Sequence, residues 1–102
     1  MARLVVTNRA RADIRQIIEY LEAHAGRSVA LRFALEFDTA FDRIADFPEI
    51  GSQRTEFGPD TRLWIVNPYL VYYDFDARDD TAVLLRVLHG HRHITMDMLR
   101  RP

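Results

Sequence analysis

The stretch "TRLWIVNPYLVYYDFDARDDTAVLLRVLH", residues 61–89, decides the fold. "TRLWIV" (Thr61–Val66), "YLVYYDF" (Tyr69–Phe75) and "TAVLLRVLH" (Thr81–His89) are rich in the β-branched and aromatic residues that strands favour. The two short separators, Asn67-Pro68 and "DARDD" (Asp76–Asp80), suit tight antiparallel hairpins. The stretch therefore predicts three consecutive strands, and the nearly continuous apolar run of the last one predicts a central strand buried on both faces.

N-terminal to these strands, the sequence predicts one short strand followed by a helix. "RLVVT" (Arg3–Thr7) is short and apolar and predicts a strand. Asn8 is the expected N-cap of a helix that ends at Gly26 with a left-handed cap. One apolar stripe runs along it at i, i+3, i+4 and i+7: Ile14, Ile17, Ile18 and Leu21.

A second helix follows almost at once. Ser28 is its expected N-cap and Pro48 stops it, and Phe37, Phe41 and Ile44 mark its apolar face. Because the connection is so short, the two helices should form an antiparallel hairpin. The turn-rich "PEIGSQRTEFGPD" (Pro48–Asp60) predicts a loop, and "ITMDMLRRP" predicts one or two C-terminal helical turns.

The predicted order β-α-α-β-β-β defines an α+β fold. An antiparallel-rich, twisted sheet must bury its apolar face, and the helix hairpin is the element able to cover it. All 102 residues belong to this single domain. In the sheet, alternation places Tyr73 and Phe75 on one face and Tyr72 on the other, and most of these aromatic side chains are expected in the core.

Composition excludes several classes of function. The chain has no cysteine, which rules out disulfides and thiolate metal sites, and all 14 of its Lys+Arg residues are arginine, which rules out lysine chemistry. No apolar run approaches the roughly 20 residues that span a bilayer, and the N-terminus lacks a signal-peptide core. We therefore expect a cytoplasmic protein without a membrane partner.

Charge is unevenly distributed along the chain. Residues 1–18 carry four arginines and one aspartate, and so do residues 86–102, whereas residues 19–85 carry six arginines against thirteen acids. The net charge of −1 argues against coating nucleic acid by bulk electrostatics, and no sequence-specific contact with nucleic acid is expected. Basic ends around an acidic centre suit a protein with one acidic and one basic partner.

The most unusual short segment is "RVLHGHRHI" (Arg86–Ile94). In an extended chain His89, His91 and His93 would share one side and could ligate zinc, but Arg92 lies inside the cluster and Gly90 disfavours extension. Acid–base catalysis by histidine beside Arg86 and Arg92 is a second possibility, and a basic edge that contacts another macromolecule is the third. We expect neither a metal site nor a cofactor.

Four segments together resemble the RelE/ParE toxin superfamily, and within it the ParE branch. They are "ADIRQIIEYL" (12–21), "ALRFALEFDTAFDRIADFPEIG" (30–51), "GPDTRLWIVNPYLVYYDF" (58–75) and "LLRVLHGHRHI" (84–94). The resemblance extends from Leu4 to about Leu99. It implies the fold predicted above, a type II toxin–antitoxin system, and an antitoxin whose C-terminal segment wraps the toxin.

The resemblance also implies two possible targets. ParE-like members poison DNA gyrase, whereas RelE-like members cut mRNA on the ribosome with basic sheet residues, an arginine at the end of the last strand and a tail tyrosine. Arg92 matches that arginine, but Met98, with Asp97 and Leu99 beside it, stands where the tyrosine would be. No basic residue follows Arg62 in "LWIVNPYLVYY", so most of the nuclease apparatus is absent.

We therefore predict a ParE-like toxin without catalytic residues, which inhibits DNA gyrase and is neutralised by a ParD-like antitoxin in a hetero-oligomeric complex. Contact with the target or the antitoxin is assigned first to Arg92 and His89, and then to His91, His93 and Arg86. A RelE-like, ribosome-dependent mRNA endonuclease and a non-toxic antitoxin-binding module are the alternatives.

Overall fold

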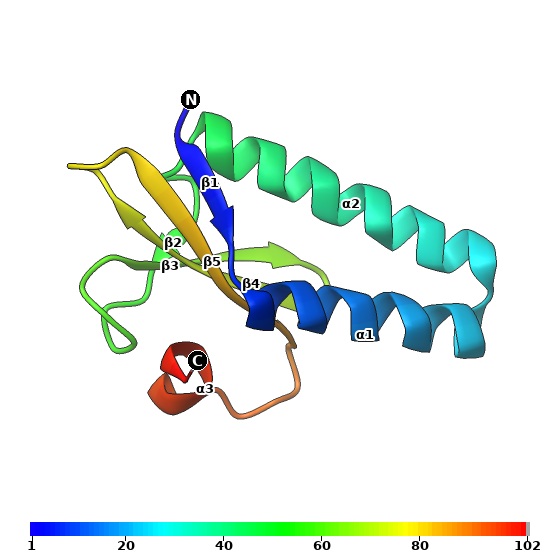
Figure 1. The fold of residues 1–102 in the computed structure, drawn as a ribbon. Helices are drawn as coiled ribbons and strands as arrows, with labels where there is room; N and C mark the ends of the chain where they lie inside the picture. The colour runs from blue at the N-terminus through cyan, green and yellow to red at the C-terminus, as the bar shows by residue number, and fades with distance from the viewer. Residues whose placement is uncertain (102) are drawn as a thin grey trace.

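The computed structural model describes residues 1–101 and confirms the predicted α+β fold class (Figure 1). The elements, in chain order, are β1 (Arg3–Val6), α1 (Asn8–Ala25), α2 (Arg27–Asp46), β2 (Ser52–Gln53), β3 (Thr61–Val66), β4 (Tyr69–Asp76), β5 (Thr81–His89) and α3 (Met96–Arg100). The short strand β2 is the addition to the predicted order, and α3 is the expected C-terminal helical turn.

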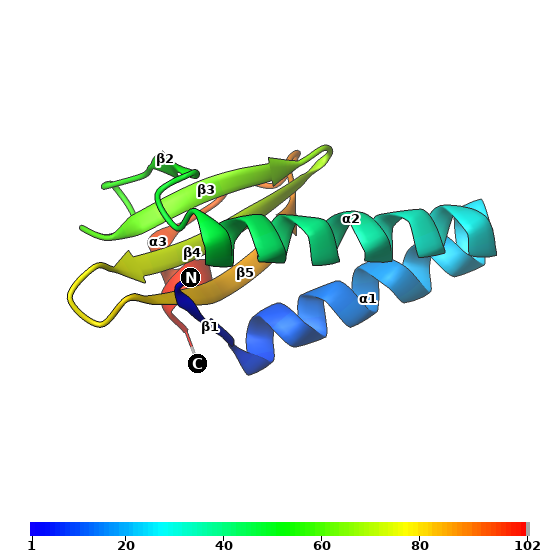
Figure 2. The same ribbon diagram turned by 90° about the horizontal axis from the view of Figure 1, so that it is seen from above.

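The five strands form one sheet in the order β1-β5-β4-β3-β2. β1 runs parallel to β5, and the other neighbours are antiparallel. The hairpin of α1 and α2 covers one face, and α3 lies on the other (Figure 2). The turn between the two long helices reaches beyond the sheet, so part of the hairpin has no strand beneath it (Figure 1).

The sheet has a core on each face. The larger one, the helix-face core, joins α2 residues such as Phe37 and Ile44 to Val71, Tyr73 and Leu84 of the central strands. Ile14, Ile17 and Ile18 of α1 pack against it, as the helical stripe predicted. The smaller one, the tail-face core, consists of Leu63, Tyr72, Leu88 and Leu99 with their partly buried neighbours. The aromatic residues of β4 therefore divide between the faces as alternation predicted.

An irregularity in the pairing of β4 with β5 shifts that alternation. Tyr72 pairs with Arg86 and Tyr73 with Leu84, so Leu85 has no partner on β4. As a result Leu84 and Val87, three positions apart, both enter the helix-face core. A β-bulge re-aims side chains in this way. The carbonyl oxygen of Leu85 accepts a hydrogen bond from Oγ1 of Thr7 at 3.2 Å.

The helix boundaries correct two predicted caps. Thr7, not Asn8, caps α1, because its Oγ1 accepts a hydrogen bond from Ala10 N at 3.1 Å. Ser28 does not cap α2, which already begins at Arg27 after Gly26. Gly26 ends α1 and begins α2 with φ 97° and ψ 164°, a positive φ as expected but with an extended ψ, so it is not the left-handed helical cap that was predicted.

The loop after α2 is held by one buried phenol. The hydroxyl of Tyr73 donates to Pro48 O at 2.8 Å and accepts from Gly51 N at 2.8 Å. A Cβ atom on Gly51 would lie 2.6 Å from that hydroxyl, so only glycine fits there. Among residues 1–101, no helix combines the length and apolar character needed to cross a bilayer.

Candidate functional site

Arg86 is buried in a junction between three elements. Its Nε lies 2.7 Å from Oδ2 of Asp13 and its Nη2 lies 2.9 Å from Oδ1, a bidentate ion pair between β5 and α1. Its Nη1 donates to Met98 O of α3 at 2.9 Å, and Val87 N also donates to Oδ2 of Asp13 at 3.0 Å. The two side chains are only 8% and 11% exposed, so this cation is used within the fold.

The chain turns sharply where β5 ends at His89. Gly90 N donates to Pro68 O at 2.8 Å, and a Cβ atom on Gly90 would lie 2.9 Å from the same oxygen, so the close approach favours glycine. Arg92 N donates to His89 O at 3.1 Å. The residues His89 to Arg92 form what we call the His-Arg turn, which ends the extended conformation required to keep three histidines on one side.

The imidazole rings of His89 and His91 contact each other and the residues around them. His89 Nδ1 accepts a hydrogen bond from His91 N at 3.1 Å, which leaves Nε2 as the protonated nitrogen of the neutral ring. The two imidazoles stack with centroids 4.8 Å apart, and Tyr69 meets His89 edge to face at 5.6 Å. Burial raises the pKa of Tyr69, and nearby Tyr20 raises it further, so its phenol stays neutral at physiological pH.

A cavity of about 340 Å³ opens between α1 and the His-Arg turn. His89 and Arg92 line it together with Asp13, Gln16 and Tyr20. Both carboxylate oxygens of Asp13 are already bonded to Arg86. Among residues 1–101 Arg92 is exposed and has no carboxylate partner. The cavity therefore presents one available cation beside an aromatic wall, which suits a carboxylate or phosphate of a partner.

The structure places the five predicted contact residues in four different environments. His89 and Arg92 share the cavity, His91 stacks beside it, and His93 is exposed and does not line it. Arg86 is buried in the junction instead. Within residues 1–101, no three His, Asp or Glu side chains come together in a way that would hold a metal ion.

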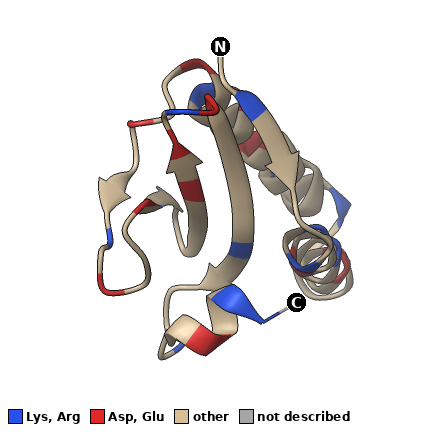
Figure 3. Ribbon diagram, turned by 60° about the vertical axis from the view of Figure 1, so that its left-hand side comes forward, with Lys and Arg blue, Asp and Glu red and all other residues tan. Residues whose placement is uncertain are grey.

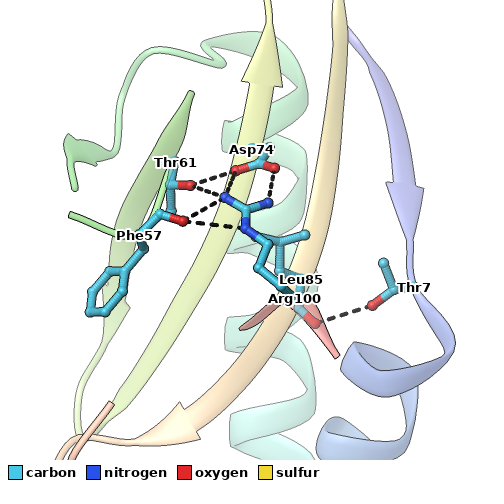
Figure 4. A network of polar contacts seen from close by, with 6 residues as sticks. All are labelled: Thr7, Phe57, Thr61, Asp74, Leu85 and Arg100. Atoms are coloured by element: carbon cyan, nitrogen blue, oxygen red, sulfur yellow. Dashed lines mark hydrogen bonds and ion pairs between the residues drawn. The ribbon is translucent and has the colours of Figure 1, made fainter. Parts of the chain in front are cut away.

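A second arginine network, on the tail, was not predicted from the sequence. Arg100 of α3 binds both carboxylate oxygens of Asp74 and Thr61 Oγ1, and it donates to Phe57 O (Figure 4). Its neighbour Leu99 is 3% exposed in the tail-face core. The sequence contains one signal of this network. Alternation along β4 places the acid Asp74 on the same face as Tyr72, where a half-buried acid needs a cation as its partner. Together with the bond from Arg86 to Met98 O, this network fixes α3 across the sheet.

The basic ends of the chain meet in space. Arg9 near the start of α1 and Arg100 and Arg101 of the tail line one cavity. Figure 3 shows the C-terminus close to one end of a long helix, with Lys and Arg in blue. The three residues come from the two segments that carry excess positive charge in the sequence. The two basic segments of the sequence therefore adjoin one another in the fold.

Solved toxins share this architecture. The structure resembles the chromosomal ParDE system of P. aeruginosa, with a TM-score of 0.72 at 19% identity, over 87% of this chain and 96% of that one. It also resembles the toxin–antitoxin complex RelBE2 from Mycobacterium tuberculosis, with a TM-score of 0.62 at 24% identity, over 86% and 96% of the two chains. The isolated E. coli RelE toxin gives 0.59 at 15% identity, over 91% and 88%. The fold is thus that of the RelE/ParE toxins.

Sequence comparisons identify the family, among the toxins with this fold, to which the chain belongs. The family model for the ParE toxin of the type II toxin–antitoxin system parDE matches residues 4–94. Two proteins of Caulobacter vibrioides are similar: Toxin ParE3 is 26% identical over 96% of both chains, and Toxin RelE2 is 34% identical over 90% of this chain and 99% of that one. The chain belongs to the ParE toxin family of type II toxin–antitoxin systems.

Proposed function

We propose that this toxin inhibits DNA gyrase by binding and not by catalysis, that the His-Arg turn makes the decisive contact, and that a ParD-like antitoxin neutralises it. The observation that carries the proposal is the contrast among the arginines near the sheet. Arg92 is exposed and unpaired within the described residues, whereas Arg62, Arg86 and Arg100 are all bonded inside the fold.

A nuclease of the RelE type would need free cations over the sheet to stabilise a phosphodiester transition state. Arg62 of β3, the last basic residue before "LWIVNPYLVYY", donates to Glu49 O at 2.9 Å and to Gly51 O at 2.8 Å. The tail face is filled by Leu99 and α3, and Tyr72 is only 4% exposed there. Tyr72 therefore offers RNA bases no open ring on which to stack, which supports binding without catalysis.

One observation favours the endonuclease as a second candidate. His89 and His91 stack beside Arg92 at the cavity, so an acid–base group and a cation lie close together. The similarity to a protein named Toxin RelE2 agrees with this reading. The two candidates differ in what they damage, because gyrase poisoning breaks DNA whereas the endonuclease cleaves transcripts.

Toxin induction in cells distinguishes these candidates. We expect growth arrest with a DNA-damage response and intact transcripts, and no arrest with Arg92→Ala. Arg101→Ala is the matched control, because Arg101 is an exposed arginine whose ion pair with Asp97 lies on the surface. Cleaved mRNA without DNA damage would establish the endonuclease instead, and normal growth with the wild-type chain would favour the non-toxic binding module.

A further inference from the structure

Three polar side chains of the cavity at the His-Arg turn are able to donate hydrogen bonds to a ligand. Gln16 and Arg92 line it, and both are exposed, with no hydrogen bond or ion pair from their side chains to any residue of the described chain 1–101. His89 lines it as well, and its Nδ1 accepts from His91 N, so Nε2 of the neutral ring is the nitrogen that donates. The arrangement favours a ligand that accepts hydrogen bonds.

The acid in the cavity lining is already neutralised. Among residues 1–101, Asp13 is the one carboxylate that lines the cavity. Its oxygens accept from Nε and Nη2 of Arg86 at 2.7 and 2.9 Å, and Oδ2 also accepts from Val87 N at 3.0 Å. Because Arg86 cancels the charge of Asp13, the guanidinium of Arg92 sets the charge of the cavity. A single anionic group therefore matches it.

The remaining walls of the cavity are apolar and aromatic. Ile17 of α1 and Val87 and Leu88 of β5 line them together with the rings of Tyr20 and Tyr69. Binding pockets commonly combine such walls with a few polar groups that fix the orientation of the ligand, and the volume of about 340 Å³ is in the range of such pockets. The cavity thus fits a group in which an anion stands beside an apolar or aromatic part.

A carboxylate of a protein meets these conditions better than a nucleic acid does. Each strand of DNA carries a phosphate charge about every 3.4 Å along the helix axis, so a bound strand presents several charges to a protein surface. The described lining offers one available cation, and the whole chain has a net charge of −1. A guanidinium binds a carboxylate through two parallel hydrogen bonds, and a peptide segment supplies apolar side chains beside its Asp or Glu.

We propose that the cavity at the His-Arg turn holds an Asp or Glu side chain of gyrase itself, carried on an acidic peptide segment, and not a phosphate of the DNA bound to the enzyme. The inference deepens the proposed function and rests on it for gyrase as the target. Arg92 binds the carboxylate, and an apolar neighbour in the same segment packs against Ile17 and Leu88. The surrounding walls reduce the screening of this ion pair by solvent.

The lack of lysine in the chain makes a direct test possible. All 14 of the Lys+Arg residues are arginine, so the chain has no side-chain amine. Arg92→Lys introduces one in the cavity and keeps the positive charge. A carbodiimide joins an amine to a carboxylate in contact with it as an amide, with loss of water, and does not join it to the phosphodiesters of DNA. We expect the Arg92→Lys toxin to cross-link to gyrase with and without DNA, and mass spectrometry to place the link at an Asp or Glu.

Three further variants complete the comparison. Gln16→Lys places the amine in the same cavity while Arg92 remains, so it should cross-link to the same gyrase peptide, and it decides the test if Arg92→Lys does not bind. Arg101→Lys is the matched control, because Arg101 is exposed and does not line this cavity, and it should give no more product than the wild type. Arg92→Gln, without carbodiimide, should bind gyrase roughly tenfold more weakly or worse, since it loses a charged donor.

The outcomes separate this inference from the proposed function. A wild-type toxin that inhibits supercoiling, with amine variants at Arg92 and Gln16 that bind gyrase but form no cross-link, would overturn the carboxylate assignment alone. The same holds if the toxin binds DNA without gyrase and Arg92→Gln weakens that binding, because Arg92 would then hold a phosphate. A wild-type toxin that neither binds gyrase nor inhibits supercoiling would remove both proposals.

Discussion

Arg86 and Arg92 lie in the same short segment and have opposite environments. Arg86 is held by a bidentate ion pair with Asp13 and by Met98 O, and its side chain is 8% exposed. Arg92 lies in the His-Arg turn beside an open cavity and is exposed. The residue type is identical, so the difference comes from what the fold brings to each guanidinium. Burial with a partner makes one arginine structural, and exposure without a partner makes the other available for recognition.

The same contrast extends to the tail. Arg100 is bound to Asp74 and Thr61 and anchors α3, whereas Arg101 reaches only Asp97 on the surface. Surface ion pairs of this kind contribute little to stability, about 0–1 kcal/mol. In each of these two pairs, we therefore expect replacement of the bonded arginine to lower the free energy of unfolding much more than replacement of the exposed one.

The largest effect on stability is expected at Arg86. Arg86→Ala leaves the Asp13 carboxylate buried without its cation, and loss of one partner of a buried pair costs about 3–5 kcal/mol. Urea denaturation followed by circular dichroism measures the free energy of unfolding. Arg101→Ala is the control and should change it by less than about 1 kcal/mol. A loss below about 1 kcal/mol for Arg86→Ala would contradict the structural role of this arginine.

Tyr73→Phe should have the next largest effect. The phenol is replaced by a ring of nearly the same shape, but Gly51 N loses its acceptor and Pro48 O its donor. Leaving buried polar groups unsatisfied costs about 1–3 kcal/mol. The measurement is again urea denaturation, with Tyr20→Phe as the control because Tyr20 is 59% exposed. Equal stability of the two variants would show that the Tyr73 hydroxyl does not hold the loop.

A smaller effect should appear at alkaline pH. Burial raises the pKa values of Tyr69, Tyr72 and Tyr73 above 10.0. The folded chain therefore keeps these protons more tightly than the unfolded chain. The resulting stability is complete below pH 10.0 and is lost as the pH rises through the raised folded-state values. Ultraviolet titration should show that these phenols ionise at a higher pH in the folded chain than in the chain unfolded by urea; ionisation at the same pH in both would contradict it.

Arg92→Ala should have the smallest effect on stability and the largest on function. An exposed side chain without partners changes the free energy of unfolding by no more than about 0.5 kcal/mol. The same substitution removes the one available cation of the cavity and should abolish toxicity. Growth assays and denaturation of the same variant test the two halves together. A variant that is folded and fully toxic would remove the His-Arg turn from the function.

Local patterns predicted the fold well. The boundaries of β3 and β5, the stripe of α1 and the division of Tyr72 and Tyr73 between the two faces all follow from periodicity and turn residues. Those features depend on neighbouring residues, which a sequence displays directly. The resemblance to the RelE/ParE toxins was likewise confirmed by the family match over residues 4–94.

The roles of individual polar residues were not predictable in the same way. The partner of Arg86 is Asp13, 73 positions away, and Arg100 meets Asp74 across 26 positions. Such pairs exist only after α1, β4, β5 and α3 have packed. The bulge at Leu85 and the two-residue β2 also have no periodic signature. For this reason the sequence grouped Arg86 with Arg92, and the folded chain separates them.

DNA supercoiling by purified gyrase in the presence of this toxin tests the proposed function most directly. We expect the wild-type toxin to inhibit supercoiling with accumulation of cleaved DNA, the antitoxin to reverse the inhibition, and Arg92→Ala to have no effect while Arg101→Ala acts as the wild type does. Supercoiling that proceeds normally at a high excess of folded wild-type toxin would contradict the gyrase proposal, and ribosome-bound mRNA would then be the substrate to test.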